Sequence, residues 1–311
     1  MSLVQVFIPT YNRATMVVDA INSILNQTFK DFEIIVLDNC SVDNTEQVIK
    51  DIMSSHSCVK YVRNTTNIGM IGNLNQIRSM VTSDYFCFLT DDDQYSTQFL
   101  NTAVSISNVH PDVMAVAMRC PTIKGGQEIG CTLDNWHEGY YEPGQGIVNC
   151  INGNHPIITN CLFSKEFSAD FFFEPALGNS SDGYLLLKLF TQHAVYISQE
   201  VSGYWNLHDN SASNEQEWVE VLSRKIKTVA YYREWIQQSK FSKFYLLVKP
   251  ISAFSAINVI AKESKNSNDI DRAFNDSAIT LLVSSYIPSV LARFSAQALN
   301  RFYKISINSP L

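Results

Sequence analysis

Short apolar runs and amphipathic segments alternate along the first third of the chain. Runs with the length of buried strands occupy residues 3–8, 32–37, 59–62, 85–89 and 113–118. Apolar side chains recur at helical spacing between them, over residues 15–25, 43–52, 70–80 and 98–109. Strands that alternate with helices across short loops form a mostly parallel sheet with helices on both faces. The pattern therefore predicts an α/β fold.

The remaining two thirds of the chain show different patterns. Residues 119–156 are rich in glycine and include Trp136, Tyr140 and Tyr141, which predicts a long flexible loop. These aromatic side chains either stack on a sugar ring or a base, or pack the loop against the body. Further ordered segments are predicted at 157–163, 181–190, 194–197 and 201–205. From about residue 215 onward the pattern predicts only helices.

Composition limits the class of protein. Hydrophobic residues make up 46% of the chain and charged residues 17%, as in a globular protein. The seven cysteines form no Cys-x-x-Cys pair, so a zinc ribbon is unsupported and a reducing compartment is favoured. The N-terminus shows no signal pattern, and no apolar run approaches the ~20 residues of a spanning helix. We therefore expect a cytoplasmic protein.

Charge is distributed unevenly. The net charge of −7 combines an acidic segment at residues 1–218 with a basic segment at residues 219–311. The basic segment suits either the anionic inner face of the cell membrane or an oligomer interface. The simpler alternative is a set of solvated Lys and Arg side chains on helical faces. A nucleic-acid partner is not expected.

Three adjacent carboxylates, Asp91, Asp92 and Asp93, directly follow the apolar run at 85–89. Adjacent carboxylates in a concave site repel one another, and a Mg²⁺ or Mn²⁺ ion removes that cost. The alternative is a solvated acidic turn that caps the next helix. Two other strands also end in polar residues, at 9–11 and at 38–39. Because the carboxyl ends of neighbouring parallel strands meet at one edge, this repetition favours a ligand crevice.

Five motifs carry a resemblance to a known family. The chain has no Gly-x-Gly-x-x-Gly or P-loop pattern, so dinucleotide and P-loop sites are excluded. It resembles instead the family 2 inverting glycosyltransferases, which have the GT-A (Rossmann-like) fold of nucleotide-diphospho-sugar transferases. The similar segments, in order, are Ile8-Pro9-Thr10-Tyr11-Asn12-Arg13, residues 23–28, residues 35–43, Asn67-Ile68-Gly69 and Leu89-Thr90-Asp91-Asp92-Asp93.

The resemblance implies roles for specific residues. Asp38 would accept a hydrogen bond from the base, and the acid cluster would contact the ribose and hold a divalent metal ion on the diphosphate. The acid motif has two possible registers: Asp91-x-Asp93 is a direct Asp-x-Asp, whereas the spacing to the next helix makes Asp92 the ligand. The implied nucleotide-sugar-binding residues are Pro9, Thr10, Tyr11, Arg13, Asp38, Asn67, Gly69, Asp91 and Asp92. The implied metal ligands are Asp92, Asp93 and His208.

The resemblance extends to about residue 213. Residues 179–185 are similar to the family's catalytic segment, so Asp182 would be the base, although Ser181 replaces the usual Glu. The implied domains are 1–215, with a nucleotide-binding half at 1–118 and an acceptor-side half at 119–215, and a helical extension at 216–311. The loop at 119–156 would close the site and contact the acceptor.

The expected function is a metal-dependent inverting transferase that moves a sugar from a nucleotide-diphosphate sugar, UDP-linked by preference, to a glycan or lipid-linked acceptor. Two alternatives are a catalytically inactive nucleotide- or glycan-binding homologue and a sugar-nucleotide nucleotidyltransferase. The second would need a Gly-rich basic loop after the first strand, and residues 10–13 do not supply one.

Overall fold

The computed structural model describes residues 2–151, 154–207, 227–228, 230–232 and 234–242. The chain divides into two compact units, residues 1–211 and residues 212–311. In the second unit, the described residues between 227 and 238 are helical, as predicted for that stretch. His208 and the rest of the predicted helical extension lie outside the described residues. Among the described residues, no helix is long and apolar enough to cross a membrane.

An eight-stranded sheet forms the centre of the first unit, in the order β3-β2-β1-β4-β10-β6-β11-β9. Only β10 and β9 run antiparallel to their neighbours. The sheet is therefore mostly parallel, as predicted. Its strands are β1 (Val4–Thr10), β2 (Phe32–Asp38), β3 (Val59–Arg63), β4 (Tyr85–Phe88), β6 (Val113–Arg119), β9 (Gly139–Tyr141), β10 (Cys161–Ser164) and β11 (Ala194–Val201).

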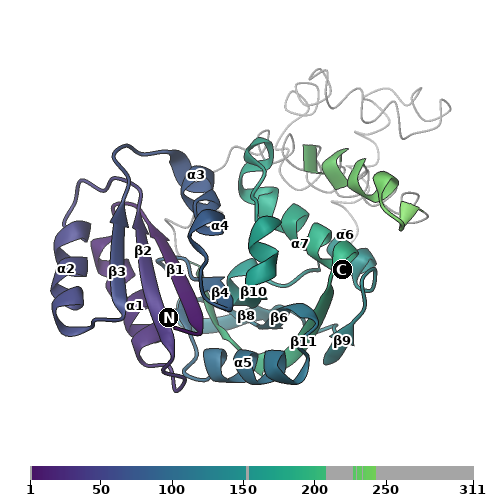
Figure 1. Cartoon of the computed structure of the whole chain (residues 1–311), viewed down its shortest axis with the longest axis horizontal. Helices are drawn as coiled ribbons and strands as arrows, with labels where there is room; N and C mark the ends of the chain where they lie inside the picture. The colour runs from purple at the N-terminus through teal and green to yellow at the C-terminus, as the bar shows by residue number, and fades with distance from the viewer. Residues whose placement is uncertain (1, 152–153, 208–226, 229, 233, 243–311) are drawn as a thin grey trace, which may run out of the picture. The chain divides into compact units, whose positions relative to one another are not determined.

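Helices cover both faces of this sheet, with α5 on one side and α7 on the other (Figure 1). Successive side chains of a strand point to opposite faces, so a strand covered on both sides is mostly apolar. In β1, Val6 packs in the same core as α1 and α5, whereas the next residue, Phe7, faces the other way and is also fully buried. The helices are α1 (Ala14–Leu25), α2 (Thr45–Ser55), α3 (Gly69–Asn75), α4 (Ile77–Met80), α5 (Phe99–Val109), α6 (Ile147–Ile151) and α7 (Ser181–Gln192).

A cluster of phenylalanines forms part of the second core. Phe86 and Phe88 of β4 each contact Phe171 edge to face, with ring centroids 5.2 and 5.9 Å apart. Phe171 also packs against Phe163 of β10 and against Phe173. Aromatic pairs in this geometry contribute beyond the area that they bury. The cluster therefore fixes the segment after β10, which leads to α7, against the centre of the sheet.

The predicted irregular loop at 119–156 contains regular structure, so that prediction is wrong for much of its length. β7 (Pro121–Lys124) and β8 (Gln127–Cys131) form a hairpin in a second sheet, of order β5-β12-β7-β8, together with β5 (Gln94–Tyr95) and β12 (Gly203–Leu207). Gly125 and Gly126 both have positive φ, which a two-residue hairpin turn requires. The Gly-Gly pair was the available sequence signal.

The aromatic residues of this stretch pack inward. Trp136 is 4% exposed and lies against Phe190 of α7, with ring centroids 5.2 Å apart. The Tyr140 hydroxyl donates to Asp112, and Tyr141 packs on Trp136. Of the two roles considered for these side chains, the structure supports packing against the body.

Gly203 lets β12 approach β5 closely, and we expect its replacement to be costly. A Cβ atom at Gly203 would lie 2.3 Å from the Gln94 carbonyl oxygen, which is backbone and cannot rotate away. Gly203→Ala should therefore lower the free energy of unfolding by about 1–3 kcal/mol, measured by urea denaturation. Gly130→Ala in β8 is the control, because a Cβ atom at Gly130 would have no other group within 4 Å. Equal losses in the two variants would contradict the prediction.

Candidate functional site

Three loops meet at the carboxyl edge of the sheet. The register pairs Thr10, the last residue of β1, with Asp38, the last residue of β2. On the other side of β1, the Leu89 amide donates to the Phe7 carbonyl, which brings the acid turn to the same edge. The structure thus places the polar residues that follow β1, β2 and β4 side by side, as expected for a ligand crevice.

Arg13 joins the first loop to the acid turn. Its Nη1 lies 2.8 Å from Asp91 Oδ1 and 2.9 Å from Asp92 Oδ2. The Thr10 hydroxyl donates to the other Asp91 oxygen at 2.7 Å. Burial raises the pKa of Asp91, while Arg13 and Thr10 act in the opposite direction. Asp92 is the more exposed of the two acids, with 16% of its side-chain surface accessible against 7% for Asp91.

Asp93 is turned away from Arg13, toward the second sheet. It accepts hydrogen bonds from the Thr90 hydroxyl at 2.6 Å and from the Asn206 backbone amide at 2.9 Å. Burial raises the pKa of the Asp93 carboxyl to about 7, although these two bonds lower it. The acid turn therefore splits: Asp91 and Asp92 share Arg13, and Asp93 anchors the turn to β12.

Asp38 is fully buried and bonded within the protein. One carboxylate oxygen accepts from the backbone amide and the hydroxyl of Ser41. The other accepts from the Tyr61 hydroxyl and lies 3.4 Å from Arg63 Nε. Burial, followed by the hydrogen bond to Asp38, raises the pKa of Tyr61. A direct contact between Asp38 and a base would require some of these bonds to open. In this structure, Asp38 fixes the loop that follows β2.

Asn67 offers hydrogen-bond donors near this loop. Asn39 Oδ1 accepts from the Ile68 amide, so the Asn39 NH₂ group must donate, and it does so to Asn67 Oδ1 at 2.8 Å. The Gly69 amide donates to the same Asn67 oxygen. Backbone amides therefore fix the orientation of both side chains. Among the described residues, none accepts a hydrogen bond from the Asn67 NH₂ group, so this group can donate to a ligand. Gly69 has φ +77°, which favours glycine.

The remaining predicted residues lie around the same edge. Pro9 is in β1, and Tyr11, which follows it, is 42% exposed. Asp182 is in the first turn of α7, where its carboxylate accepts from the Gly183 amide at 2.7 Å. Helix α7 ends at Gln192, just before the first residue of β11. That residue pairs with the first residue of the parallel strand β6, so this end of α7 is at the amino edge of the sheet. The opposite end of α7, with Asp182, therefore points toward the carboxyl edge of the sheet.

The donor set suits a cation that also binds phosphate. Among the described residues, no three His, Cys, Asp or Glu side chains gather into a metal cage. Mg²⁺ commonly uses one or two carboxylates together with substrate phosphate oxygens. Asp92, the more exposed acid beside Arg13, fits that arrangement, whereas both oxygens of Asp93 are engaged.

Several contacts of the candidate residues were not predicted from the sequence. Tyr61 and Arg63 bond Asp38. Thr90 and Asn206 hold Asp93. Arg13 was expected beside the base, but it contacts the acids. A parallel partner strand for 32–38 would have placed Arg63 opposite Asp38. Asn206 lies 113 residues after Asp93, and no local pattern indicates that contact.

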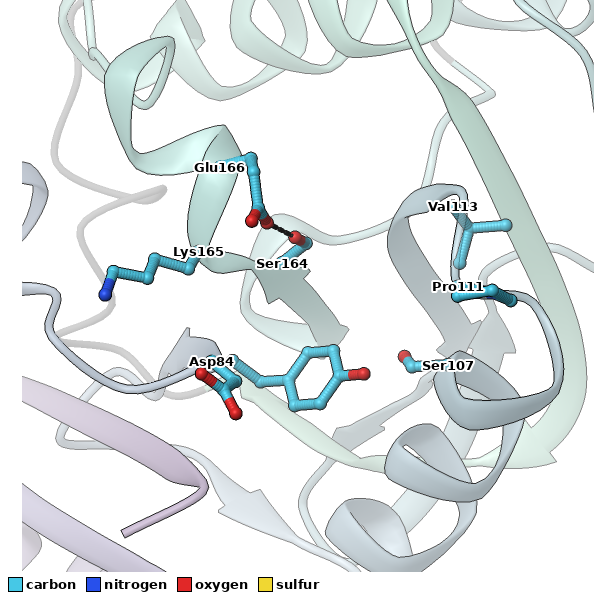
Figure 2. A pocket seen from close by; sticks show the side chains of 8 residues that line it. Asp84, Ser107, Pro111, Val113, Ser164, Lys165 and Glu166 are labelled. Atoms are coloured by element: carbon cyan, nitrogen blue, oxygen red, sulfur yellow. Dashed lines mark hydrogen bonds between the residues drawn. The ribbon is translucent and has the colours of Figure 1, made fainter. Parts of the chain in front are cut away.

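A pocket of about 250 Å³ lies at the opposite edge of the sheet (Figure 2). Tyr85 begins β4, Val113 begins β6 and Ser164 ends β10, so the pocket is at the amino ends of the parallel strands. The Ser164 hydroxyl donates to Glu166, as Figure 2 shows. Lys165 Nζ donates to the Thr82 carbonyl at 3.0 Å. This pocket is separate from the cluster of polar residues at the carboxyl edge.

The buried position of Asp93 predicts a pH dependence of stability. Its folded-state pKa of about 7 exceeds the ~3.9 of an unfolded chain. The stabilisation from the protonated form is fully present below about pH 3.9 and is lost as the pH rises to about 7. The side chain of Asp93→Asn cannot ionise. The free energy of unfolding of this variant, relative to that of wild type, should therefore rise by about 2 kcal/mol from pH 5 to pH 8. The measurement is urea unfolding in EDTA, and a pH-independent difference would contradict it.

Comparisons with known proteins point to one family. A model of "Glycosyl transferase family 2" matches residues 5–172. A Campylobacter jejuni GalNAc(5)-diNAcBac-PP-undecaprenol beta-1,3-glucosyltransferase is 36% identical over 109 residues, 35% of this chain and 35% of that protein. A Staphylococcus aureus poly(ribitol-phosphate) beta-N-acetylglucosaminyltransferase, TarS, is 28% identical over 118 residues, 37% of this chain and 20% of that protein. The match thus spans about a third of the first relative's length.

Solved structures share the fold. The crystal structure of S. aureus TarS 1–349 in complex with UDP-GlcNAc has a TM-score of 0.70 at 15% identity, covering 98% of this chain and 90% of that one. The Pyrobaculum calidifontis mannosyltransferase PcManGT, in complex with GDP-Man and Mn²⁺, has a TM-score of 0.55 at 15% identity, with coverages of 98% and 85%. At this level of identity the likeness shows the fold alone.

Proposed function

The chain belongs to glycosyl transferase family 2, and on that premise we propose that it transfers a sugar from a UDP-sugar to a hydroxyl of a glycan or lipid-linked acceptor, with inversion and with a divalent metal ion. The observation that carries the proposal is the meeting of Thr10, Arg13, Asp91 and Asp92 at the carboxyl edge of the sheet. This arrangement combines carboxylates, which can hold a metal ion, with a guanidinium, which can bind phosphate oxygens.

The donor half of the site follows from these contacts. Asp92 would hold Mn²⁺ or Mg²⁺, and the bound ion would neutralise the leaving diphosphate. The exposed Tyr11 ring and the Asn67 NH₂ group would face the nucleoside. Support for a UDP donor comes from TarS, whose structures contain UDP and UDP-GlcNAc. Support for the metal ion comes from PcManGT, whose structure contains Mn²⁺.

The acceptor half is built around α7. Asp182 would take the proton from the attacking hydroxyl while that oxygen bonds to the anomeric carbon and the diphosphate leaves. Attack from the face opposite the leaving group inverts the anomeric carbon. Residues 119–215 would supply the acceptor contacts, with 216–311 as an additional domain. The name of the C. jejuni relative includes PP-undecaprenol, which supports a lipid-linked acceptor.

Metal-dependent nucleotide binding tests the donor half. Calorimetric titration should show UDP binding that strengthens with Mn²⁺ in wild type and loses the Mn²⁺ dependence in Asp92→Asn. The carboxamide cannot supply the charge that the ion needs. Asp19→Asn, an exposed acid on α1, is the control and should behave as wild type. No binding of UDP, GDP or dTDP by wild type would overturn the proposal.

Loss of the base tests the acceptor half. Asp182→Asn should lower the transfer rate about 10²–10⁴-fold, because general-base catalysis typically contributes that factor. UDP binding in the presence of Mn²⁺ should stay at the wild-type level, since Asp182 would contact the acceptor and not the nucleotide. The measurement is UDP release from UDP-sugars with undecaprenyl-diphosphate-linked acceptors. Transfer at the wild-type rate would exclude Asp182 as the base.

A further inference from the structure

Arg13 binds the carboxylate that is assigned to the metal ion. One nitrogen, Nη1, lies 2.8 Å from Asp91 and 2.9 Å from Asp92. The two acids are adjacent in sequence, and the bridging guanidinium offsets their mutual repulsion. Arg13 therefore performs part of the charge neutralisation that the sequence suggested for a cation.

Arg13 and a divalent cation cannot both use Asp92 fully. A cation bound to the Asp92 carboxylate would lie beside the guanidinium, and like charges at such short range repel. Asp91 differs, because it is more buried and its second oxygen is held by Thr10. The guanidinium can thus leave Asp92 and keep its contact with Asp91.

The diphosphate of the donor offers Arg13 another partner. Guanidinium groups bind phosphate oxygens through strong, charge-assisted hydrogen bonds. The Arg13 side chain is 28% exposed and stands at the start of α1, so it borders solvent at the carboxyl edge of the sheet. A phosphate group placed there would be within reach of the same side chain.

We propose that Arg13 is a positioning residue that couples metal binding to nucleotide binding: it occupies Asp92 until the donor diphosphate accepts its guanidinium. This inference rests on the proposed function. Without nucleotide, a metal ion must compete with Arg13 for Asp92, whereas with nucleotide that competition is relieved. By linkage, the factor by which UDP strengthens Mn²⁺ binding equals the factor by which Mn²⁺ strengthens UDP binding.

Mn²⁺ titrations of variants test the coupling without any measurement of transfer. Electron paramagnetic resonance of free Mn²⁺ gives the affinity without UDP and at saturating UDP for wild type, Arg13→Gln and Arg13→Lys. Mn²⁺ also binds UDP directly, so cooperativity in wild type alone does not identify Arg13, and the comparison with the variants does. Lys50→Gln, which removes one charge from a surface ion pair with Glu46 on α2, controls for net charge.

We expect Arg13→Gln to bind Mn²⁺ without UDP at least fivefold more tightly than wild type. The factor by which UDP strengthens Mn²⁺ binding should fall by a similar ratio. Lys50→Gln should stay within twofold of wild type. Arg13→Lys should lie between wild type and Arg13→Gln, because lysine keeps the positive charge but its side chain is one bond shorter and its ammonium reaches the two carboxylates less well. It also provides the test if Arg13→Gln does not fold.

Unchanged or weaker Mn²⁺ binding without UDP in folded Arg13→Gln would overturn the coupling role. If only Arg13→Lys folds, an affinity equal to that of wild type would overturn it in the same way. A failure of all four proteins to bind UDP would instead overturn the proposed function, and the titrations without UDP would still decide whether Arg13 and Mn²⁺ compete.

Discussion

The apolar covering on both faces of the central sheet is the constraint on which the rest of this unit depends. β1 is fully buried at Val6 on one face and at Phe7 on the other, and Gln5 is its one buried polar side chain before Thr10. Most polar side chains therefore lie outside the interior of the strands. They gather where the strands end, and the parallel register of β1 with β2 and β4 brings those ends together. The gathering of polar residues at this edge is therefore a consequence of how the core is covered.

The acids collected at this edge are compensated by different means. Asp38 is compensated by Tyr61, Ser41 and Arg63, and it becomes part of the framework. Asp93 is compensated by hydrogen bonds and by a raised pKa of about 7, which weakens its charge near neutral pH. Asp92 differs from both, because Arg13, a partly exposed side chain, contributes to its compensation. An acid compensated in this way is the one best suited to exchange partners.

The sequence predicted the alternation of strands and helices, and with it the edge where the candidate residues meet, because local periodicity determines both. The sequence did not predict that the acids have different bonding partners and different roles. Asp93 bonds the amide of Asn206, 113 residues later, through a second sheet that the glycine-rich composition of 119–156 concealed. Similarly, Asp38 resembles a binding residue by motif, yet Tyr61 and Arg63 reach it only through the pairing of β2 with β3. Contacts between distant segments depend on the packed fold, which a local pattern does not contain.

The two halves of the proposed site are held by different physical means. The donor half rests on strand ends whose positions the hydrogen-bond register specifies to within one residue. The acceptor half rests on α7, which follows a segment with a non-helical Gly178 and packs through Phe190 on Trp136. The family model ends at residue 172, before α7, so the match covers the register-determined half. This division suits a transferase: donors share a diphosphate, which requires one fixed geometry, whereas acceptors differ, and side-chain packing around a helix accommodates change more readily than a strand register.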